Sequence, residues 1–366
     1  MNKKVAVVAD VMVEHGGAEK VTESFLKMFP GADLYTLYIV SAARKKLEAE
    51  FPRIVIRTSP FQWLIRVNRV TKYISIIKLF SWIYWELLDL NKYDLVISSS
   101  HSYMAKNVKT KKGAMHLAYI HTPPRYLYGE FNEIGWIKKF PFRIFLWPIM
   151  KVLRMIDKQG AKRPDVLVAN SENIRKRIIK YYDREAVVVY PPIEVKIPKS
   201  DTNRGEYYVC LSRLVKQKGI DLAVKTCTDN KLPLVVVGGG DESVNLKRMA
   251  GSTVKFAGEC KNKQKFKILS GAKALIYTSK EEDFGIVPVE ALKMGIPVIA
   301  LASGGVMESV VHKKNGVLFD SFDQKSLLRG MKLLDSLDIE KQVCIDSVRK
   351  FSFENFRSQI NKLAPE

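Results

Sequence analysis

Two glutamates stand on either side of an expected strand-to-helix turn in the segment EDFGIVPVE. Glu282 falls in the loop after the strand, and Glu290 lies about two turns into the helix that follows. The amides of Phe284, Gly285 and Ile286 would form the helix N-terminus, whose unpaired N–H groups and dipole attract an anion. A loop carboxylate for sugar hydroxyls, amides for phosphate and a deeper carboxylate for ribose together indicate a nucleotide-sugar site.

Glu290 interrupts an otherwise apolar helix face with the sequence VPVEAL. The alternative interpretation is a capping or surface residue. A charge on such a face nevertheless requires a buried partner, because an unpaired charge is costly to remove from water. We therefore expect Glu290 to have such a partner.

Arg213 and Lys218 are two of the cations in the earlier segment SRLVKQKGID. Arg213 closes an expected strand, and Lys218 lies five residues later, near the start of the next helix. Both cations and the helix dipole would face one edge of the sheet, which suits a diphosphate. The alternative is surface charge in a chain with 60 lysines and arginines.

A pair of glycines, Gly16 and Gly17, lies at the first strand-to-helix junction, where the sequence reads HGGAE. Glycines let a backbone approach a ligand closely, and the helix N-terminus offers N–H groups to an anion. A simple turn is an equally good interpretation of this pair alone.

To act together, these residues must lie at one edge of a sheet of parallel strands. The first half of the chain contains apolar runs separated by helical stretches, which is typical of a parallel sheet covered on both faces. The runs are Val5–Asp10, Asp33–Tyr38, Ile54–Arg57, Asp94–Ser100, His116–His121, Asp165–Ser171 and Ala186–Pro192. The second half repeats the pattern at Tyr207–Leu214, LPLVVVGGGDE, TVKFAGEC, AKALIYTS and Ile296–Leu301.

A break follows Pro191-Pro192 in the polar segment KIPKSDTNRGE, the best linker in the chain. We expect an α/β protein with two Rossmann-like, doubly wound domains, residues 1–195 and 196–345. The segment FSFENFRSQINKL, within residues 346–366, would be a helix that returns to the first domain. Such sheets bind ligands at the carboxyl ends of their strands, and the cleft between the domains is the expected active site.

The chain of 366 residues has a formal net charge of +22, which implies an acidic partner. Basic residues alternate with aromatic and aliphatic ones from Phe61 to Leu90 and from Trp136 to Arg163. That composition is typical of helices lying in an anionic membrane surface. The alternative is an ordinary core with a solvated charged face. We expect no nucleic-acid partner, because zinc-finger spacing, an RNA-recognition motif and a basic region joined to heptads are all missing.

No apolar run approaches the roughly 18 residues that cross a bilayer. The first residues, MNKKVAVVAD, do not resemble a signal segment, and the four cysteines show no CxxC spacing. We therefore expect neither a zinc cage nor a disulfide framework, and a cytoplasmic location.

Several blocks, in this order, resemble glycosyltransferase family 4, the retaining enzymes with the GT-B fold of two facing Rossmann-like domains. The blocks are EHGGAE, HTPPRYLY, ANSENIRKRI, YPPIE, SRLVKQKGID, VVVGGGDE and EEDFGIVPVEALKMGIPVIALASGG. The HTPPRYLY block resembles the subset that builds mannose-containing bacterial surface polysaccharides such as O-antigen.

The resemblance implies a role for each matching residue. Arg213 and Lys218 would bind the donor diphosphate, and Glu282 would contact the donor sugar. His121 would also contact the transferred sugar, although a packed histidine at a strand end is the alternative. Donor binding would further involve Gly16, Gly17, Phe284, Gly285, Ile286 and Glu290, with Glu290 on the ribose.

Three more residues lie in matching blocks. Arg125 and Tyr126 follow His121 and would help to bind donor or acceptor. Asp157 occupies a position where the family often has an aspartate, and the resemblance assigns it no role.

The resemblance also implies how the reaction would proceed. The chain contains no Asp-x-Asp triplet to hold a metal, and we expect neither a metal nor another cofactor. Cations and helix N-termini would then neutralise the leaving diphosphate. Retention would follow from attack on the same face of the sugar, with the leaving phosphate taking the acceptor's proton.

The leading hypothesis is a mannosyltransferase that uses GDP-mannose and a polyprenyl-diphosphate-linked glycan at the inner face of the cytoplasmic membrane. A UDP-hexose, dTDP-rhamnose or GDP-rhamnose is the alternative donor. A dehydrogenase is excluded by the missing GxGxxG and the missing acidic residue roughly 20 positions later. A non-catalytic lipid- or nucleic-acid-binding protein would explain the charge but not the grouped cations and carboxylates.

Overall fold

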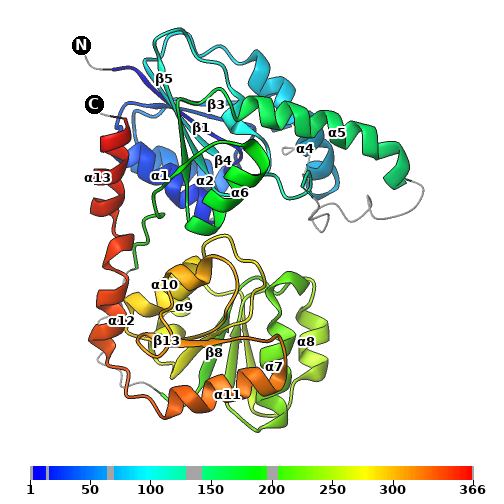
Figure 1. Cartoon of the computed structure of the whole chain (residues 1–366), viewed down its shortest axis with the longest axis vertical. Helices are drawn as coiled ribbons and strands as arrows, with labels where there is room; N and C mark the ends of the chain where they lie inside the picture. The colour runs from blue at the N-terminus through cyan, green and yellow to red at the C-terminus, as the bar shows by residue number, and fades with distance from the viewer. Residues whose placement is uncertain (1–2, 14–15, 64–69, 129–141, 196–204, 365–366) are drawn as a thin grey trace. The chain divides into compact units, whose positions relative to one another are not determined.

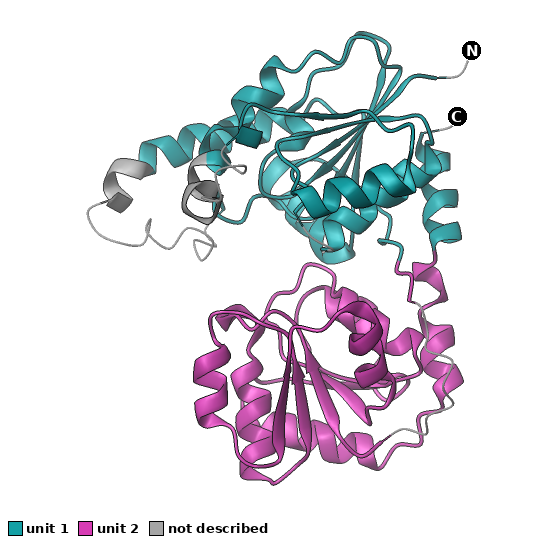
Figure 2. Cartoon of the chain, turned by 180° about the vertical axis from the view of Figure 1, so that it is seen from behind, with its two compact units in different colours: residues 1–192, 353–366 teal, residues 193–352 magenta. Residues whose placement is uncertain are grey.

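The computed structural model describes residues 3–13, 16–63, 70–128, 142–195 and 205–364. The chain divides into two compact units (Figure 2). Unit 1 consists of residues 1–192 and 353–366, and unit 2 consists of residues 193–352.

Unit 1 is built on a parallel sheet with the strand order β3-β2-β1-β4-β5-β6-β7. Its strands are β1 (Val5–Ala9), β2 (Asp33–Thr36), β3 (Ile56–Thr58), β4 (Leu95–Ser100), β5 (Met115–Ile120), β6 (Val166–Ala169) and β7 (Val187–Val188). Its described helices include α1 (Gly17–Met28), α2 (Ser41–Glu50), α4 (Val70–Leu87), the 3-10 turn η1 (Ala105–Asn107), α5 (Phe142–Gly160), α6 (Glu172–Tyr182) and α13 (Phe353–Leu363).

The sheet of unit 1 is buried on both faces, as a parallel sheet must be. Successive side chains of β1 alternate between two core clusters, since Val7 joins one and Val8 the other. The Val7 cluster includes residues of α1 and α13, two helices that lie side by side in Figure 1. The rings of Phe25 and Phe356 on these helices are 5.4 Å apart. The Val8 cluster is covered by α4 and α5. The predicted return of the C-terminal helix to the first domain is therefore confirmed.

Unit 2 has a second parallel sheet with the strand order β10-β9-β8-β11-β12-β13. Its strands are β8 (Tyr208–Leu211), β9 (Leu234–Val237), β10 (Val254–Gly258), β11 (Ala274–Tyr277), β12 (Val298–Leu301) and β13 (Gly316–Phe319). Its helices are η4 (Lys216–Lys218), α7 (Ile220–Asp229), α8 (Ser243–Met249), α9 (Asn262–Ser270), α10 (Ile286–Lys293), η5 (Gly305–Glu308), α11 (Gln324–Asp335), α12 (Lys341–Ser347) and η6 (Arg349–Phe351).

Both sheets reverse their strand order beside the first strand of the unit. The reversal lies between β1 and β4 in unit 1 and between β8 and β11 in unit 2. Loops on the two sides of such a point diverge and leave a crevice at the carboxyl ends of the strands. The residues that follow β8 and β11 therefore occupy the expected binding edge of unit 2.

The strand predictions depart furthest from the structure at two places. The strand expected over Ala186–Pro192 is shortened to Val187–Val188, because Pro191 and Pro192 have no N–H group for the sheet. Sequence analysis also missed β13, whose four residues follow a polar loop and are too few to show a pattern.

Candidate active site

The residues that follow β8 and β11 place a charged pair at the binding edge of unit 2. Lys218 ends the η4 turn, and Glu282 lies in the loop after β11. Lys218 Nζ is 2.5 Å from Glu282 Oε2. The hydroxyls of Tyr277 and Ser279 donate to the same oxygen at 2.7 and 2.8 Å. Three donors therefore fix the orientation of this carboxylate.

The charge state of Glu282 follows from these contacts. Burial alone would raise the pKa of this carboxyl group. The Lys218 charge and the hydrogen bonds from Lys218, Tyr277 and Ser279 outweigh burial and lower the pKa to about 2. Glu282 is therefore a carboxylate at neutral pH.

The loop that carries Glu282 leads into the N-terminus of α10. Gly285 precedes the helix with a φ of +90°, a left-handed conformation that favours glycine. The first helical amides belong to Ile286 and Val287, and Phe284 is buried just before them. The residues predicted to bind phosphate thus form a helix N-terminus, although Pro288 contributes no N–H group.

A second loop, which follows β12, packs against the backbone of the Glu282 loop. Gly305 N donates to Glu282 O at 2.8 Å. A Cβ on Gly304 would lie 2.4 Å from Glu282 O, and Gly304 has a φ of +70°. Only glycine allows this close approach.

Glu290 is buried within α10, and its exposed fraction is 1%. Lys265 of α9 pairs with it, with Nζ 3.0 Å from Oε2. The predicted buried partner of Glu290 is therefore present. Sequence analysis did not identify Lys265, because several lysines alternate in KNKQKFK and nothing distinguishes this one.

Arg213 and Lys218 both follow β8, but their surroundings differ. Arg213 is exposed, whereas Lys218 is half-buried. A hollow of about 480 Å³ opens beside Lys216, between α7 and α8, and none of the predicted site residues lines it.

In unit 1, the predicted glycine pair forms the start of α1. Gly16 precedes the helix with extended backbone, and Gly17 is its first residue. Gly16 is exposed, so these amides lie at an accessible helix N-terminus. The flanking residues 14 and 15 of the EHGGAE block lie outside the described residues.

His121 follows β5 and is buried at the carboxyl edge of the sheet. Its Nε2 lies 2.8 Å from Ser99 Oγ, which orients the ring. Burial, helped by the neighbouring His101, lowers the pKa of His121 to about 3. The imidazole is therefore neutral at physiological pH.

A buried aspartate that sequence analysis did not single out lies beside His121. Asp10 accepts hydrogen bonds from the amides of His101, Tyr103 and Ala105 at 2.6, 2.9 and 2.7 Å. His101 Nδ1 lies 2.9 Å from Asp10 Oδ2, and the rings of His101 and His121 are 6.3 Å apart. Burial opposes the charged form of His101, but Asp10 raises its pKa overall. In the sequence, the only indication of this role for Asp10 is its position at the end of an expected strand.

The turn after His121 contains the two remaining predicted residues. Arg125 is half-buried, whereas Tyr126 is fully buried. The Tyr126 hydroxyl donates to Lys78 O of α4 at 3.2 Å. Tyr126 therefore anchors the turn inside unit 1, and Arg125 is its more accessible residue.

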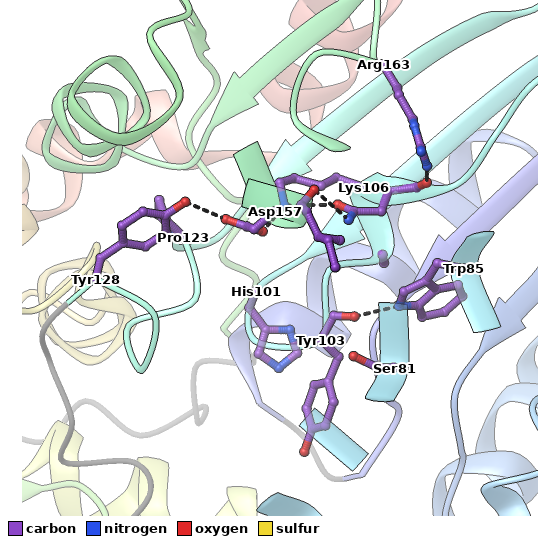
Figure 3. A network of polar contacts seen from close by, with 12 residues as sticks. Ser81, Trp85, His101, Tyr103, Lys106, Pro123, Tyr128, Asp157 and Arg163 are labelled. Atoms are coloured by element: carbon purple, nitrogen blue, oxygen red, sulfur yellow. Dashed lines mark hydrogen bonds and ion pairs between the residues drawn. The ribbon is translucent and has the colours of Figure 1, made fainter. Parts of the chain in front are cut away.

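Asp157 lies on α5 and is buried in an ion pair with Lys106 (Figure 3). Tyr128, in the HTPPRYLY block, donates to the second oxygen of Asp157 at 2.8 Å. This network connects three segments that are far apart in the sequence.

Comparison with known proteins identifies the family of this chain. A family model described as Glycosyltransferase Family 4 matches residues 15–196, and one described as Glycosyl transferases group 1 matches residues 192–351. The Alpha-1,3/1,6-mannosyltransferase ALG2 of Saccharomyces cerevisiae is 24% identical over 276 residues, 60% of this chain and 53% of that protein. The human ALG2 protein is 34% identical over 140 residues, 31% of this chain and 34% of that protein. The chain spans about half or less of the length of these curated relatives.

Solved structures share the fold over the whole chain. Anabaena Alr3699/HepE in complex with UDP has a TM-score of 0.71 at 16% identity and covers 98% of this chain and 99% of its own. TarM has a TM-score of 0.70 at 15% identity, with 100% and 99% covered. The two family models together account for residues 15–351 and meet near the boundary between the two parallel-sheet units. The chain belongs to glycosyltransferase family 4 and has the GT-B fold.

Proposed function

We propose that this chain is a retaining hexosyltransferase that transfers mannose from GDP-mannose to a lipid-linked glycan. The acceptor would be a polyprenyl-diphosphate-linked glycan in the synthesis of a bacterial surface polysaccharide such as O-antigen. The observation that carries the proposal is the Lys218–Glu282 pair at the carboxyl edge of unit 2, directly before the α10 N-terminus. The yeast and human relatives are named mannosyltransferases, which supports mannose as the transferred sugar.

In the proposed reaction, the bond between the anomeric carbon and the diphosphate breaks, and its electron pair leaves with the phosphate. The acceptor oxygen forms the new bond on the same face of the sugar, and its proton passes to a phosphate oxygen. Arg213, Lys218 and the amides of Ile286 and Val287 stabilise the charge that develops on the diphosphate. They perform the role that a divalent cation has in metal-dependent transferases.

The carboxylates of unit 2 would orient the rest of the donor. Glu282 would accept from sugar hydroxyls, since Lys218, Tyr277 and Ser279 hold it charged and in one orientation. Glu290 would hold the ribose. An ionised acceptor forms stronger hydrogen bonds than a neutral one, so the Glu282 carboxylate would favour a bound nucleotide sugar.

Residues of unit 1 would also contact donor and acceptor. The amides at Gly16 and Gly17 would bind the donor diphosphate, and neutral His121 would contact the transferred sugar. Ser99 holds the His121 ring in place, which suits a hydrogen-bonding role. Arg125 would bind an anionic group of donor or acceptor.

Unit 1 would also hold the enzyme on the inner face of the cytoplasmic membrane. Met150 and Leu153 of α5 pack into the core, whereas Trp147, Val152 and Met155 on the same helix are 61%, 49% and 56% exposed. Among the described side chains of this helix, the exposed cations are Lys151 and Lys158. Exposed apolar residues beside cations suit an anionic lipid surface. Among the described residues, no helix has the length and apolar character needed to cross a bilayer.

A second helix of unit 1 has the same character. Ile77 and Trp85 of α4 are buried, but Phe80, Ile83 and Leu87, spaced three and four residues apart, are 48%, 39% and 79% exposed. This helix is therefore apolar on an outward face as well as on its core face. The predicted membrane segments also include residues 64–69 and 136–141, which lie outside the described residues.

A donor screen tests the proposed activity. The purified chain is incubated with membrane extract and GDP-mannose, UDP-glucose, UDP-galactose, UDP-N-acetylglucosamine or dTDP-rhamnose, and nucleoside diphosphate release is followed. Release from GDP-mannose alone supports the proposal. Release from a UDP- or dTDP-sugar would leave the proposed site in place but show that the donor is not GDP-mannose. If the chain showed neither turnover nor nucleotide binding, the proposal that it is a glycosyltransferase would be wrong.

A further inference from the structure

Unit 1 contains an ion pair that the proposed chemistry does not use. The side chains of Lys106 and Asp157 are 1% and 0% exposed, and the pair joins η1 to α5. Moving two charges out of water costs free energy, and mutual attraction offsets this cost only when further hydrogen bonds complete the site. An apolar pair of similar volume would often serve stability as well. The other contacts of this pair therefore indicate what it does.

Each oxygen of Asp157 has a separate partner. Oδ1 contacts Lys106 Nζ, which also donates to Asn107 Oδ1 at 3.2 Å. Oδ2 accepts from the Tyr128 hydroxyl at 2.8 Å. Burial and the Asp157 charge both raise the pKa of Tyr128, so its hydroxyl stays protonated and donates. Figure 3 shows Lys106 and Tyr128 approaching Asp157 from different segments.

Tyr128 closes the turn that carries Arg125. Its amide donates to Arg125 O at 3.2 Å, and Leu127 N donates to Pro124 O at 2.9 Å. Tyr126 in the same turn is tied to α4 through its hydroxyl. Two tyrosine hydroxyls therefore attach this turn to two helices, and the half-buried Arg125 begins it.

The ring of Tyr128 has a second, independent attachment. It stacks on Tyr181 of α6 with ring centroids 4.2 Å apart and an angle of 13° between the planes. A phenylalanine at this position would keep the stacked ring and lose only the hydrogen bond to Asp157. The effect of that hydrogen bond is thus separable from the effect of packing.

We propose that Lys106 and Asp157 are positioning residues for glycosyl transfer. They hold the Tyr128 hydroxyl, and through it the turn that sets Arg125 a few residues beyond His121. The pair itself touches neither donor nor acceptor. This inference rests on the proposed function, because it assigns Arg125 a place in that reaction.

The test compares Tyr128→Phe and the double variant Lys106→Met/Asp157→Leu with the single variant Asp157→Asn in the full chain. Asp157→Asn should lower the melting temperature, because Lys106 is left buried without its carboxylate. The double variant should recover most of that loss. Both it and Tyr128→Phe should still show kcat reduced by about tenfold, since a small misplacement in a reaction centre is costly to rate.

Tyr93→Phe is the matched control. Tyr93 also donates to a carboxylate, that of Asp33, but this bond lies at the amino edge of the same sheet, where β2 begins. Its loss should leave kcat unchanged. If the double variant and Tyr128→Phe both turn over like the wild type, the pair serves stability alone and the proposal is wrong.

Hydrogen exchange of residues 121–128 provides a readout that needs no donor. The backbone amides of residues 127 and 128 should exchange faster in Tyr128→Phe and in the double variant. Their exchange should stay unchanged in Tyr93→Phe. Unaltered exchange in all three would overturn the inference even if the wild type transferred no sugar. If the wild type neither transferred sugar nor bound nucleotide while exchange was still faster in these variants, the proposed function would be wrong and only the role of the pair in holding the turn would remain.

Discussion

Lys218 Nζ lies 2.5 Å from Glu282 Oε2, so the cation proposed for the donor diphosphate and the carboxylate proposed for the donor sugar form one ion pair. The two side chains are 20% and 19% exposed, which leaves Lys218 accessible to an anion. An incoming diphosphate would share this ammonium with Glu282. Replacing either residue changes the environment of the other, so each variant needs its own control.

Lys218→Ala should lower turnover more than about tenfold, because a positioned cation stabilises the leaving diphosphate mainly in the transition state. The variant should stay soluble, since the residue lies at the unit's surface edge and not in its core. Steady-state release of nucleoside diphosphate measures the effect. Lys216→Ala removes an exposed cation from the same 3-10 turn and should retain near-normal turnover. Near-normal turnover of Lys218→Ala would contradict the assignment.

Glu282→Ala should strongly reduce sugar transfer and leave nucleotide diphosphate binding largely intact. The physical reason is the sign of the charge, because removing a carboxylate beside Lys218 makes the site more attractive to an anion. Calorimetric titration with GDP, next to turnover with GDP-mannose, separates the two effects. Glu282→Gln is the matched variant, since its amide oxygen still accepts from Tyr277 and Ser279. Loss of GDP binding in both variants would exclude the sugar role.

The same carboxylate predicts a pH dependence of stability. Its pKa is about 2 in the folded chain, below the ordinary value of 4.5. The stabilisation is therefore complete above pH 4.5 and is lost as the pH falls towards 2. The difference in melting temperature between wild type and Glu282→Gln should narrow over that range. If the difference in melting temperature stayed constant from pH 4.5 down to pH 3, ionisation of Glu282 would not contribute to the stability of the folded chain.

Sequence reasoning was sufficient for the backbone of the site but not for its side-chain contacts. Strand ends and helix starts follow from apolar runs, so the loops of Lys218 and Glu282 fall at one edge of a sheet in both the prediction and the structure. The two partners are 64 positions apart in the sequence, and nothing in the segment between them indicates that they touch. Lys106 and Asp157 are 51 residues apart, and their pairing likewise depends on how η1 and α5 pack.

Gly304→Ala should disturb the site through the backbone alone. The added Cβ would lie 2.4 Å from Glu282 O, at a residue with a φ of +70°. We expect a loss of roughly 3 kcal/mol or more in unfolding free energy, together with reduced turnover. Gly258→Ala is the control, because its φ is +69° but a Cβ there meets nothing within 4 Å. It should cost only about 1 kcal/mol, from backbone strain. Equal losses in the two variants would show that crowding at Glu282 has no effect.

The proposed membrane surface is tested by reversing its charge. Lys151 and Lys158 are exposed on α5, and the Lys151 ammonium lies 5.7 Å from the centre of the Trp147 ring. Lys151→Glu/Lys158→Glu should weaken binding to vesicles rich in anionic lipid by about tenfold or more, because each cation near such a surface contributes about 1 kcal/mol. Co-sedimentation with anionic and zwitterionic vesicles measures this, and binding should fall as salt rises.

A control variant separates the effect of net charge on vesicle binding from the effect of where the charges lie. Lys325→Glu/Lys332→Glu changes the net charge of the chain by the same amount but acts on exposed lysines of α11 in unit 2. This variant should bind vesicles nearly as well as the wild type. Trp147→Ser/Met155→Ser keeps every charge and should also weaken binding, since it removes apolar side chains that would enter the lipid. If the two charge reversals weaken binding equally, the net charge and not α5 holds the chain on the membrane.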